Sequence, residues 1–553
     1  MNGARRLPVP LAAAIGAGVL ALALLPGAVA GREGRAPAPD LGTGAARLPA
    51  APLVVALPAL ASGAEQMVPL LARLGLALPE LDPSQLLIDL RLRYGLDPFD
   101  RSSLSALGID PTGPCHVVDS GALVRPVLLL RLLPGGRDRF EQNAIARAAG
   151  REQLTARTAR RVRGVDVVGW SASRTAPVRI AYAVDGERLA FAPSGCATGV
   201  DCVGEALRPR RLLAQDRAAQ VVLAGLPDAA LIAVAHQTAL HEAPLIGARA
   251  GGERVSALAL SLGVEREQAR LTVRVLPTAA GRQQLAGYPA LGGRAARLVQ
   301  RRGALSLWFG VDAKGAAALA LPLPYLASLR TALSAVGLDL DRELRAVADG
   351  GAALHVIDLE PRLPGLDEER SIDGALGAFF VEHGLEVPLL AFAGGEKTVS
   401  SLDRALGRRG GLLQLPGAAS GTAAHLYAES GRVVGYALVD GELLVASGPG
   451  TLEQLAAERG PSETAAPGTF LALRGDAARA RALLGRVGLF GAGDNRALRG
   501  VWAARQVASP LLGRLGALRL DLRRAGNLVE IEAQLELCGK VAPHRMAVEP
   551  APP

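Results

Sequence analysis

Two stretches of the chain, 258–275 and 518–537, alternate apolar and polar side chains with period two. The inward positions of the first stretch are Leu258, Leu260, Leu262, Leu271, Val273 and Val275, and those of the second are Leu518, Leu520, Leu522, Val529, Ile531, Ala533, Leu535 and Leu537. Successive side chains of a strand point to opposite faces of a sheet, so this pattern predicts two antiparallel hairpins, each with one buried face and one wet face. Leu518 lies 260 positions after Leu258, and Ile531 lies 260 positions after Leu271.

A second repeated motif places Asp-Gly between two apolar runs. Residues 182–187 read Tyr-Ala-Val-Asp-Gly-Glu, and residues 436–442 read Tyr-Ala-Leu-Val-Asp-Gly-Glu. Asp-Gly between apolar runs is typical of a two-residue hairpin turn, because glycine adopts the positive φ that such turns require. The predicted turn residues are Asp185, Gly186, Asp440 and Gly441.

Weaker matches occur in the same order along the chain. Gly-Leu-Asp occurs at 95–97 and 337–339, and His116 and His355 each precede two β-branched residues. The common order indicates a duplication with a period far longer than that of a solenoid repeat. It predicts an α+β fold of two homologous halves, each an antiparallel sheet of hairpins covered by helices on one face.

We expect the first half to span residues 50–300 and the second 301–540. The segment between the histidine motif and the next apolar strand is longer in the second half, which predicts an insertion at about 361–386. An insertion present in one half is a natural place for a specialised binding loop, but a surface loop with a short helix is the favoured explanation.

The N-terminus has the pattern of a secretion signal. Arg5 and Arg6 precede an uncharged apolar run over 11–25, and Ala28-Val29-Ala30 supplies small residues for cleavage. The run is shorter than the roughly 20 residues of a membrane-spanning helix. We therefore expect a signal peptide over 1–30 and a periplasmic or extracellular protein. An uncleaved N-terminal membrane anchor is the alternative. Residues 31–49 and 541–553, rich in Gly, Ala and Pro, are expected to form a flexible linker and a disordered tail.

The formal charge of +9 changes little in this picture. The cations are almost all arginine, in short clusters, and only 3% of residues are aromatic. Single-stranded nucleic-acid grooves combine cations with stacking aromatics, so we expect no nucleic-acid partner. Solvated surface charge explains the clusters, and weak contact with an anionic membrane surface is the remaining option.

Four cysteines are present, and two of them flank a pentapeptide that contains glycine. Cys196 and Cys202 are candidates for a small disulfide loop, which an exported protein can keep. Cys115 and Cys538 could pair with each other or both stay reduced.

Catalytic and cofactor motifs are missing from the sequence. Gly169-Trp170-Ser171-Ala172-Ser173 fails the nucleophile-elbow pattern at its last position, and no lysine has the context of a phosphate-binding loop. His236 and His241 are five residues apart, a spacing that does not place both on one helix face as a zinc pair requires. We therefore predict no catalytic, metal-binding or cofactor-binding residues.

With its Asp-Gly hairpins, Gly-Leu-Asp motifs and signal peptide, the chain resembles exported proteins of GC-rich bacteria that have a duplicated α+β unit. That resemblance implies location and architecture and no activity. Three hypotheses follow. The first is a non-catalytic cell-envelope protein that binds an apolar ligand or a protein partner. The alternatives are an envelope hydrolase with a site assembled from dispersed residues, and a structural scaffold.

Overall fold

The computed structural model describes most of the first half of the chain and the sheet of the second. The described residues are 38–77, 90–119, 126–196, 199–242, 254–265, 267–285, 288–301, 305–310, 351–356, 389–393, 412–415, 424–429, 432–439, 442–446, 459–481 and 515–538. The predicted signal peptide, the predicted insertion and the C-terminal tail lie outside these residues, as do Asp440 and Gly441.

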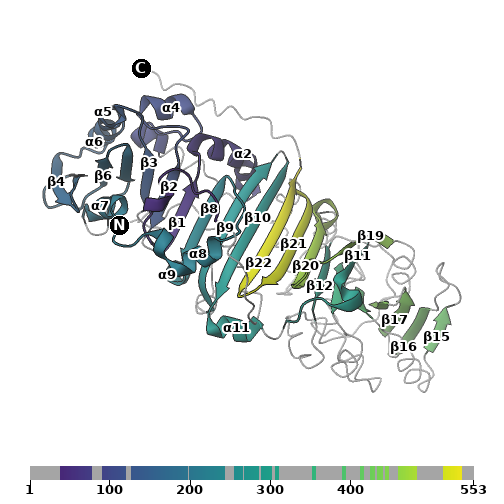
Figure 1. Ribbon diagram of the computed structural model, residues 1–553. Coiled ribbons are helices and arrows are strands. Elements are labelled where there is room, and N and C mark those ends of the chain that lie inside the picture. The colour runs from purple at the N-terminus through teal and green to yellow at the C-terminus, as the bar shows by residue number, and fades with distance from the viewer. Residues whose placement is uncertain are drawn as a thin grey trace.

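Helices and a large antiparallel sheet make up the described chain, as expected for an α+β protein. Twenty strands pair side by side into one sheet that runs across the molecule (Figure 1). On one side the pairing order is β4 (Ala156–Val162), β5 (Val165–Ser171), β6 (Ile180–Asp185), β7 (Arg188–Ala192), β3 (Val127–Arg131), β2 (Cys115–Asp119), β1 (Leu53–Leu57), β8 (Leu231–His236), β9 (Val255–Glu265) and β10 (Gln268–Pro277). It continues through β22 (Leu528–Leu537), β21 (Leu515–Ala525), β20 (Thr469–Asp476), β12 (Leu305–Phe309), β13 (Ala352–Val356), β14 (Leu389–Ala393), β18 (Glu442–Ala446), β17 (Arg432–Val439), β16 (Ala424–Glu429) and β15 (Leu412–Leu415). A separate pair joins β11 (Arg297–Arg301) to β19 (Arg459–Thr464).

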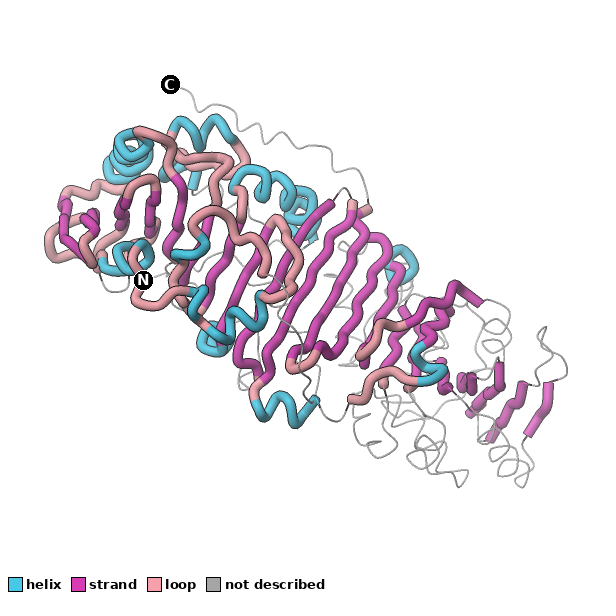
Figure 2. Tube along the Cα trace, in the orientation of Figure 1, coloured by secondary structure: helices cyan, strands magenta, loops and turns pink. Residues whose placement is uncertain are grey.

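The two sequence halves meet where β10 pairs with β22, a junction that we call the seam. Eight residue pairs form the seam, from Gln268 opposite Glu536 to Val275 opposite Val529. The long magenta strands that lie side by side at the centre of Figure 2 are the antiparallel strands around the seam. Both predicted hairpins are present. Because their outer strands β10 and β22 pair with each other, the main-chain hydrogen bonding continues from one half into the other.

The hairpins on either side of the seam have the same register. Leu271 pairs with Leu262, and the residues 260 positions later, Ile531 and Leu522, also pair with each other. At the middle of the seam Thr272 lies opposite Glu532, which is 260 positions further along the chain.

Helices pack on both faces of the first half of the sheet. They are α2 (Leu60–Ala77), α4 (Arg101–Ala106), α5 (Gly136–Phe140), a π turn (Glu141–Ile145), α6 (Ala146–Arg151), α7 (Asp201–Leu207), α8 (Arg217–Leu223), α9 (Gln237–Glu242) and α11 (Ala279–Leu285), with short 3₁₀ turns at Ala45–Arg47, Leu213–Gln215 and Gly293–Ala296. Asp100 and Asp216 cap α4 and α8 by accepting hydrogen bonds from the backbone N–H groups of Ser102 and Ala219.

The prediction that helices cover one face is wrong for this half. Leu129 packs with Val203 of α7 and Val222 of α8, whereas the next residue, Leu130, packs with Phe140 and Ala148 on the opposite face. β3 is apolar on both faces, so each face needs its own cover.

Residues 38–49, which fall in the predicted flexible linker, pack against the folded chain. The backbone carbonyl of Leu41 contacts Nε2 of His116 at 2.9 Å, and the side chain of Leu48 is 1% exposed. Pro49 forms a β-bridge with Leu212. The folded chain therefore begins earlier than composition suggests, because an Ala- and Pro-rich segment can still bury its few large apolar side chains.

Candidate functional site

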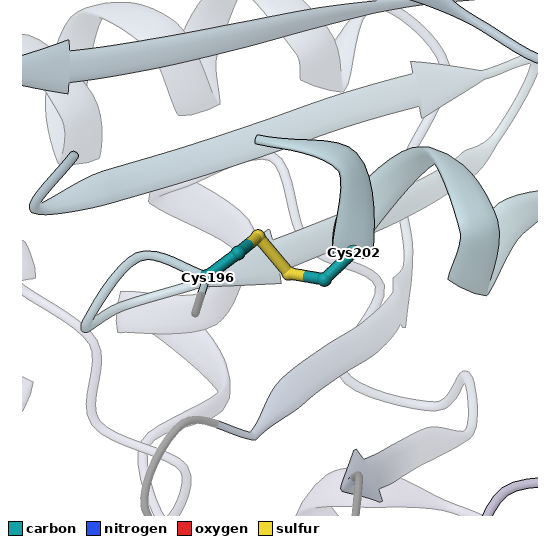
Figure 3. The surroundings of a disulfide bond; sticks show 2 residues. All are labelled: Cys196 and Cys202. Atoms are coloured by element: carbon teal, nitrogen blue, oxygen red, sulfur yellow. A yellow bond between two sulfur atoms is a disulfide. The ribbon is translucent and has the colours of Figure 1, made fainter. Parts of the chain in front are cut away.

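The cysteine pair at 196 and 202 forms a disulfide (Figure 3). Cys196 follows β7 and Cys202 lies in the first turn of α7, with their Cα atoms 5.8 Å apart. Cys196 is 3% exposed and belongs to the core under α7, so the bond fixes a helix to the sheet. Closing so short a loop contributes about 2 kcal/mol of stability in the chain-entropy account.

The other two cysteines are not joined to each other. Cys115 is 7% exposed at the start of β2. Burial raises the pKa of the Cys115 thiol to about 12, so it stays protonated and unreactive at neutral pH.

The Asp-Gly turn of the first half has a structural role. Asp185 ends β6 and pairs with Arg188, and Gly186 begins the turn with φ +64°. The carboxylate of Asp185 accepts hydrogen bonds from Nε and Nη2 of Arg208 at 3.0 and 3.1 Å, which lowers the pKa of Asp185. This fork ties the hairpin to the end of α7.

The two histidines of the repeated motif are both buried, at 4% and 1% exposure for His116 and His355. Nδ1 of His355 lies 2.8 Å from Oγ of Ser306, and Nε2 of His116 contacts the Leu41 carbonyl. His116 is the second residue of its strand and His355 the fourth, so their positions differ by two residues. Both make hydrogen bonds inside the folded chain.

Charged side chains fill the wet face of the seam. Nη2 of Arg274 lies 2.9 Å from Oε1 of Glu530, and both side chains are 10% exposed. Arg523 on β21 pairs with Glu530 and with Glu532, each at 2.7 Å. The Arg274–Glu530 pair crosses the seam and is buried, so it costs desolvation and leaves an unpaired charge when one partner is lost. It therefore favours one register of the seam over others.

A second set of charges lies next to it on β19, β20 and β21. Nη1 of Arg474, 9% exposed, lies 2.8 Å from Asp521, and Arg474 also pairs with Glu463. Arg519 bridges Glu463 and Asp521, each at 3.0 Å. The two carboxylates are thereby shared between two guanidiniums.

Glu463, Arg474 and Arg519 line a groove of about 790 Å³ that crosses the seam. Its lining includes four carboxylates, three guanidiniums and two amides, namely Glu265, Glu267, Glu463, Glu536, Arg270, Arg474, Arg519, Gln268 and Gln534. None of the ion pairs among the described residues includes Glu265 or Glu267, which are exposed at the turn between β9 and β10. The volume lies within the range of ligand sites, roughly 300–1,000 Å³. Its lining suits charged and hydrogen-bonding groups.

Sequence reasoning placed the polar residues of 518–537 on the wet face of their hairpin and assigned them no function. A stronger signal was present, because Arg523 on one strand lies opposite Glu530 on the next, while Arg519 lies opposite Gln534. Opposite charges at directly opposed positions of neighbouring strands indicate an ion pair on that face. The groove itself was not predictable, because it requires knowing that β10 and β22 are neighbours.

Further features of the described chain bear on function. Among the described residues, no helix is long and apolar enough to cross a membrane. In the same part of the chain, no group of three or more His, Cys, Asp and Glu residues is placed to hold a metal ion.

No known protein family matches the chain, and no curated protein does. Two crystal structures are similar to part of it. Crystal form III of TP0453 matches with a TM-score of 0.22 and 8% identity, covering 43% of this chain and 80% of that one. Crystal form I of TP0453 matches with a TM-score of 0.20 and 9% identity, covering 43% and 79%. Likeness at this level says nothing about what this chain does.

Proposed function

We propose that the chain is an exported, non-catalytic binding protein of the cell envelope, and that the groove at the seam receives a segment of a protein partner. Export is supported by the signal-like pattern of residues 1–30 and by a disulfide, which persists in oxidising compartments. Binding is supported by the groove, the observation on which the proposal depends most.

The groove chemistry favours a protein partner over an apolar ligand. An apolar ligand would remove water from Arg270, Glu265 and Glu267 without replacing their hydrogen bonds, which is costly. A polypeptide offers backbone donors and acceptors together with charged side chains. The two carboxylates outside the described ion pairs favour a segment that carries Lys or Arg. Among the described residues, the groove lining contains no hydroxyl, thiol or imidazole, and it offers a hydrolase no nucleophile other than a carboxylate.

The proposal also includes the duplication, with halves near 50–300 and 301–540. Its support is that ten strands on each side of the seam follow the same pairing order, and that the hairpins beside the seam share one register. In this account the groove arises where the two copies of one hairpin meet edge to edge.

Site-specific photocrosslinking in cells that express the chain tests the binding role. A photoreactive phenylalanine derivative replaces Gln534 in the groove, and in a matched control it replaces the exposed Arg174. We expect a discrete protein adduct from position 534 only. The double variant Glu265→Gln/Glu267→Gln should reduce that adduct, whereas Asp166→Asn, an exposed acid elsewhere, should not. Equal adducts at both positions, or none at 534, would refute the proposal.

The structural scaffold remains the second candidate because of one observation. Eight residue pairs join the halves into a single sheet, and continuous main-chain pairing of this kind is what a structural connection requires. A scaffold predicts no dependence of any partner contact on the groove carboxylates, so the same experiment separates the two roles.

A further inference from the structure

A second cavity, of about 280 Å³, lies at one end of strands β2, β3 and β7, far along the sheet from the seam. Thr43 and Gly44 of the N-terminal segment border it, and Leu129 and Leu130 contribute apolar wall. Its polar lining consists of His116, Arg131, Glu187 and Arg188. All of these residues lie in the described chain.

Two arginines face each other directly in this cavity. Arg131 at the end of β3 is the cross-strand partner of Arg188 at the start of β7, so both side chains leave the sheet on the same face. Cβ atoms of such partners are about 5 Å apart, and like charges placed this way destabilise a sheet. A fold that retains this arrangement needs something to offset the repulsion.

The carboxylates nearby form direct ion pairs only with Arg131, among the described residues. Nη2 of Arg131 lies 3.2 Å from Glu187, and its Nε lies 3.7 Å from Asp110. Arg188 takes part in none of the ion pairs among the described residues, and its Nη1 donates a hydrogen bond to the Leu207 carbonyl at 3.2 Å. Asp185, next to it across the hairpin, already accepts the fork of Arg208.

Arg188 is therefore a half-buried cation that forms no direct ion pair in the described chain, although the Asp185 carboxylate attracts it across the hairpin. Burial lowers the pKa of Arg188 and the positive charge of Arg47 acts in the same direction, whereas the Asp185 carboxylate acts against them. His116 adds no formal charge at neutral pH, because burial lowers its pKa as well. With two guanidiniums and one carboxylate, the cavity lining carries an excess of one positive charge.

We propose that this cavity binds a phosphate group. A tetrahedral phosphate presents several oxygens at once, so it can accept hydrogen bonds from both guanidiniums, whereas a planar carboxylate is matched by a single arginine fork. Binding would relieve the repulsion between Arg131 and Arg188 and neutralise the buried cation. The cavity holds a phosphate with a few further atoms, and the group belongs either to a free phosphate compound or to a lipid headgroup.

Isothermal titration of the full chain with inorganic phosphate, at constant ionic strength set by chloride, tests the proposal. We expect saturable binding that Arg188→Gln weakens roughly tenfold or more, the effect of losing a charge-assisted hydrogen bond. Arg131→Gln should weaken it as well. Arg174→Gln removes one exposed arginine remote from the cavity and should bind like the unaltered chain.

A readout without ligand separates a binding role from a structural one. In phosphate-free buffer, Arg188→Gln should be at least as thermally stable as the unaltered chain, because it removes one of two facing cations. A clear loss of stability in that buffer would show that Arg188 supports the fold, and it would overturn the proposal. Phosphate binding that Arg188→Gln leaves unchanged would also overturn the proposal. The same holds if the unaltered chain binds neither inorganic phosphate nor vesicles that contain phosphatidic acid.

The source of the phosphate is resolved by flotation with phosphatidylcholine vesicles that contain phosphatidic acid. Binding that exceeds binding to pure phosphatidylcholine, and that Arg188→Gln abolishes, assigns the site to a lipid headgroup. Titration with glycerol 3-phosphate that succeeds while flotation fails assigns it to a soluble phosphate compound.

Discussion

Replacing Ile531 by Ala measures how strongly the seam holds the two parts of the sheet together. Ile531 is 1% exposed and lies between Val273 of β10 and Leu522 of β21, each also 1% exposed. The truncation removes three buried carbons and leaves a cavity between three strands. Substitutions of this kind cost about 2–5 kcal/mol.

The neighbouring residue supplies the matched control. Glu532 lies on the same strand with its side chain on the opposite face, 42% exposed and paired with Arg523 at 2.7 Å. An ion pair this exposed is worth about 0–1 kcal/mol, so Glu532→Ala should change stability little.

Urea unfolding of the full chain, followed by far-ultraviolet circular dichroism, compares the two variants. Ile531→Ala should move the midpoint to lower urea clearly, while Glu532→Ala should stay close to the unaltered chain. A register shifted by one residue would exchange the two faces and reverse the order. Equal or reversed midpoints would therefore refute the assigned register.

Three further predictions concern individual residues. Burial holds the pKa of His116 below 6.5, so as the pH falls the unfolded chain takes up this proton before the folded chain does. The free energy of unfolding should therefore decrease as the pH drops below that value. Urea midpoints compared from pH 7.5 to 5 should show a shallower decrease for His116→Gln. Cys202→Ser should cost about 2 kcal/mol, and mild reduction of the unaltered chain should reproduce that loss. Gly186→Ala should cost about 1 kcal/mol in the same assay, because φ at Gly186 is +64° and an alanine there is strained.

Local pattern was sufficient for much of the secondary structure. Alternation in 258–275 and 518–537 predicted two hairpins, and both are present with the expected pairing. The spacing of Cys196 and Cys202 predicted their disulfide, because a short loop keeps two thiols within reach. These features depend on contacts between residues close in the sequence.

Features that depend on distant contacts were not predictable. β10 and β22 have the same alternation, and nothing in either segment specifies that its outer edge pairs with the other. The groove, which exists only across that junction, was therefore hidden. The cation pair of Arg131 and Arg188 was hidden for the same reason, since 57 positions separate its members and a cross-strand register brings them together.

Cysteine crosslinking across the seam tests the central claim most directly. Thr272 and Glu532 are directly opposite each other on the wet face. The double variant Thr272→Cys/Glu532→Cys should form a disulfide on mild oxidation, identified by mass spectrometry of the joined peptides. The pair Thr272→Cys/Gln534→Cys, two residues out of register and roughly 7–8 Å apart, should crosslink far less. Absence of the first crosslink, or preference for the second, would contradict a single sheet joined at this register.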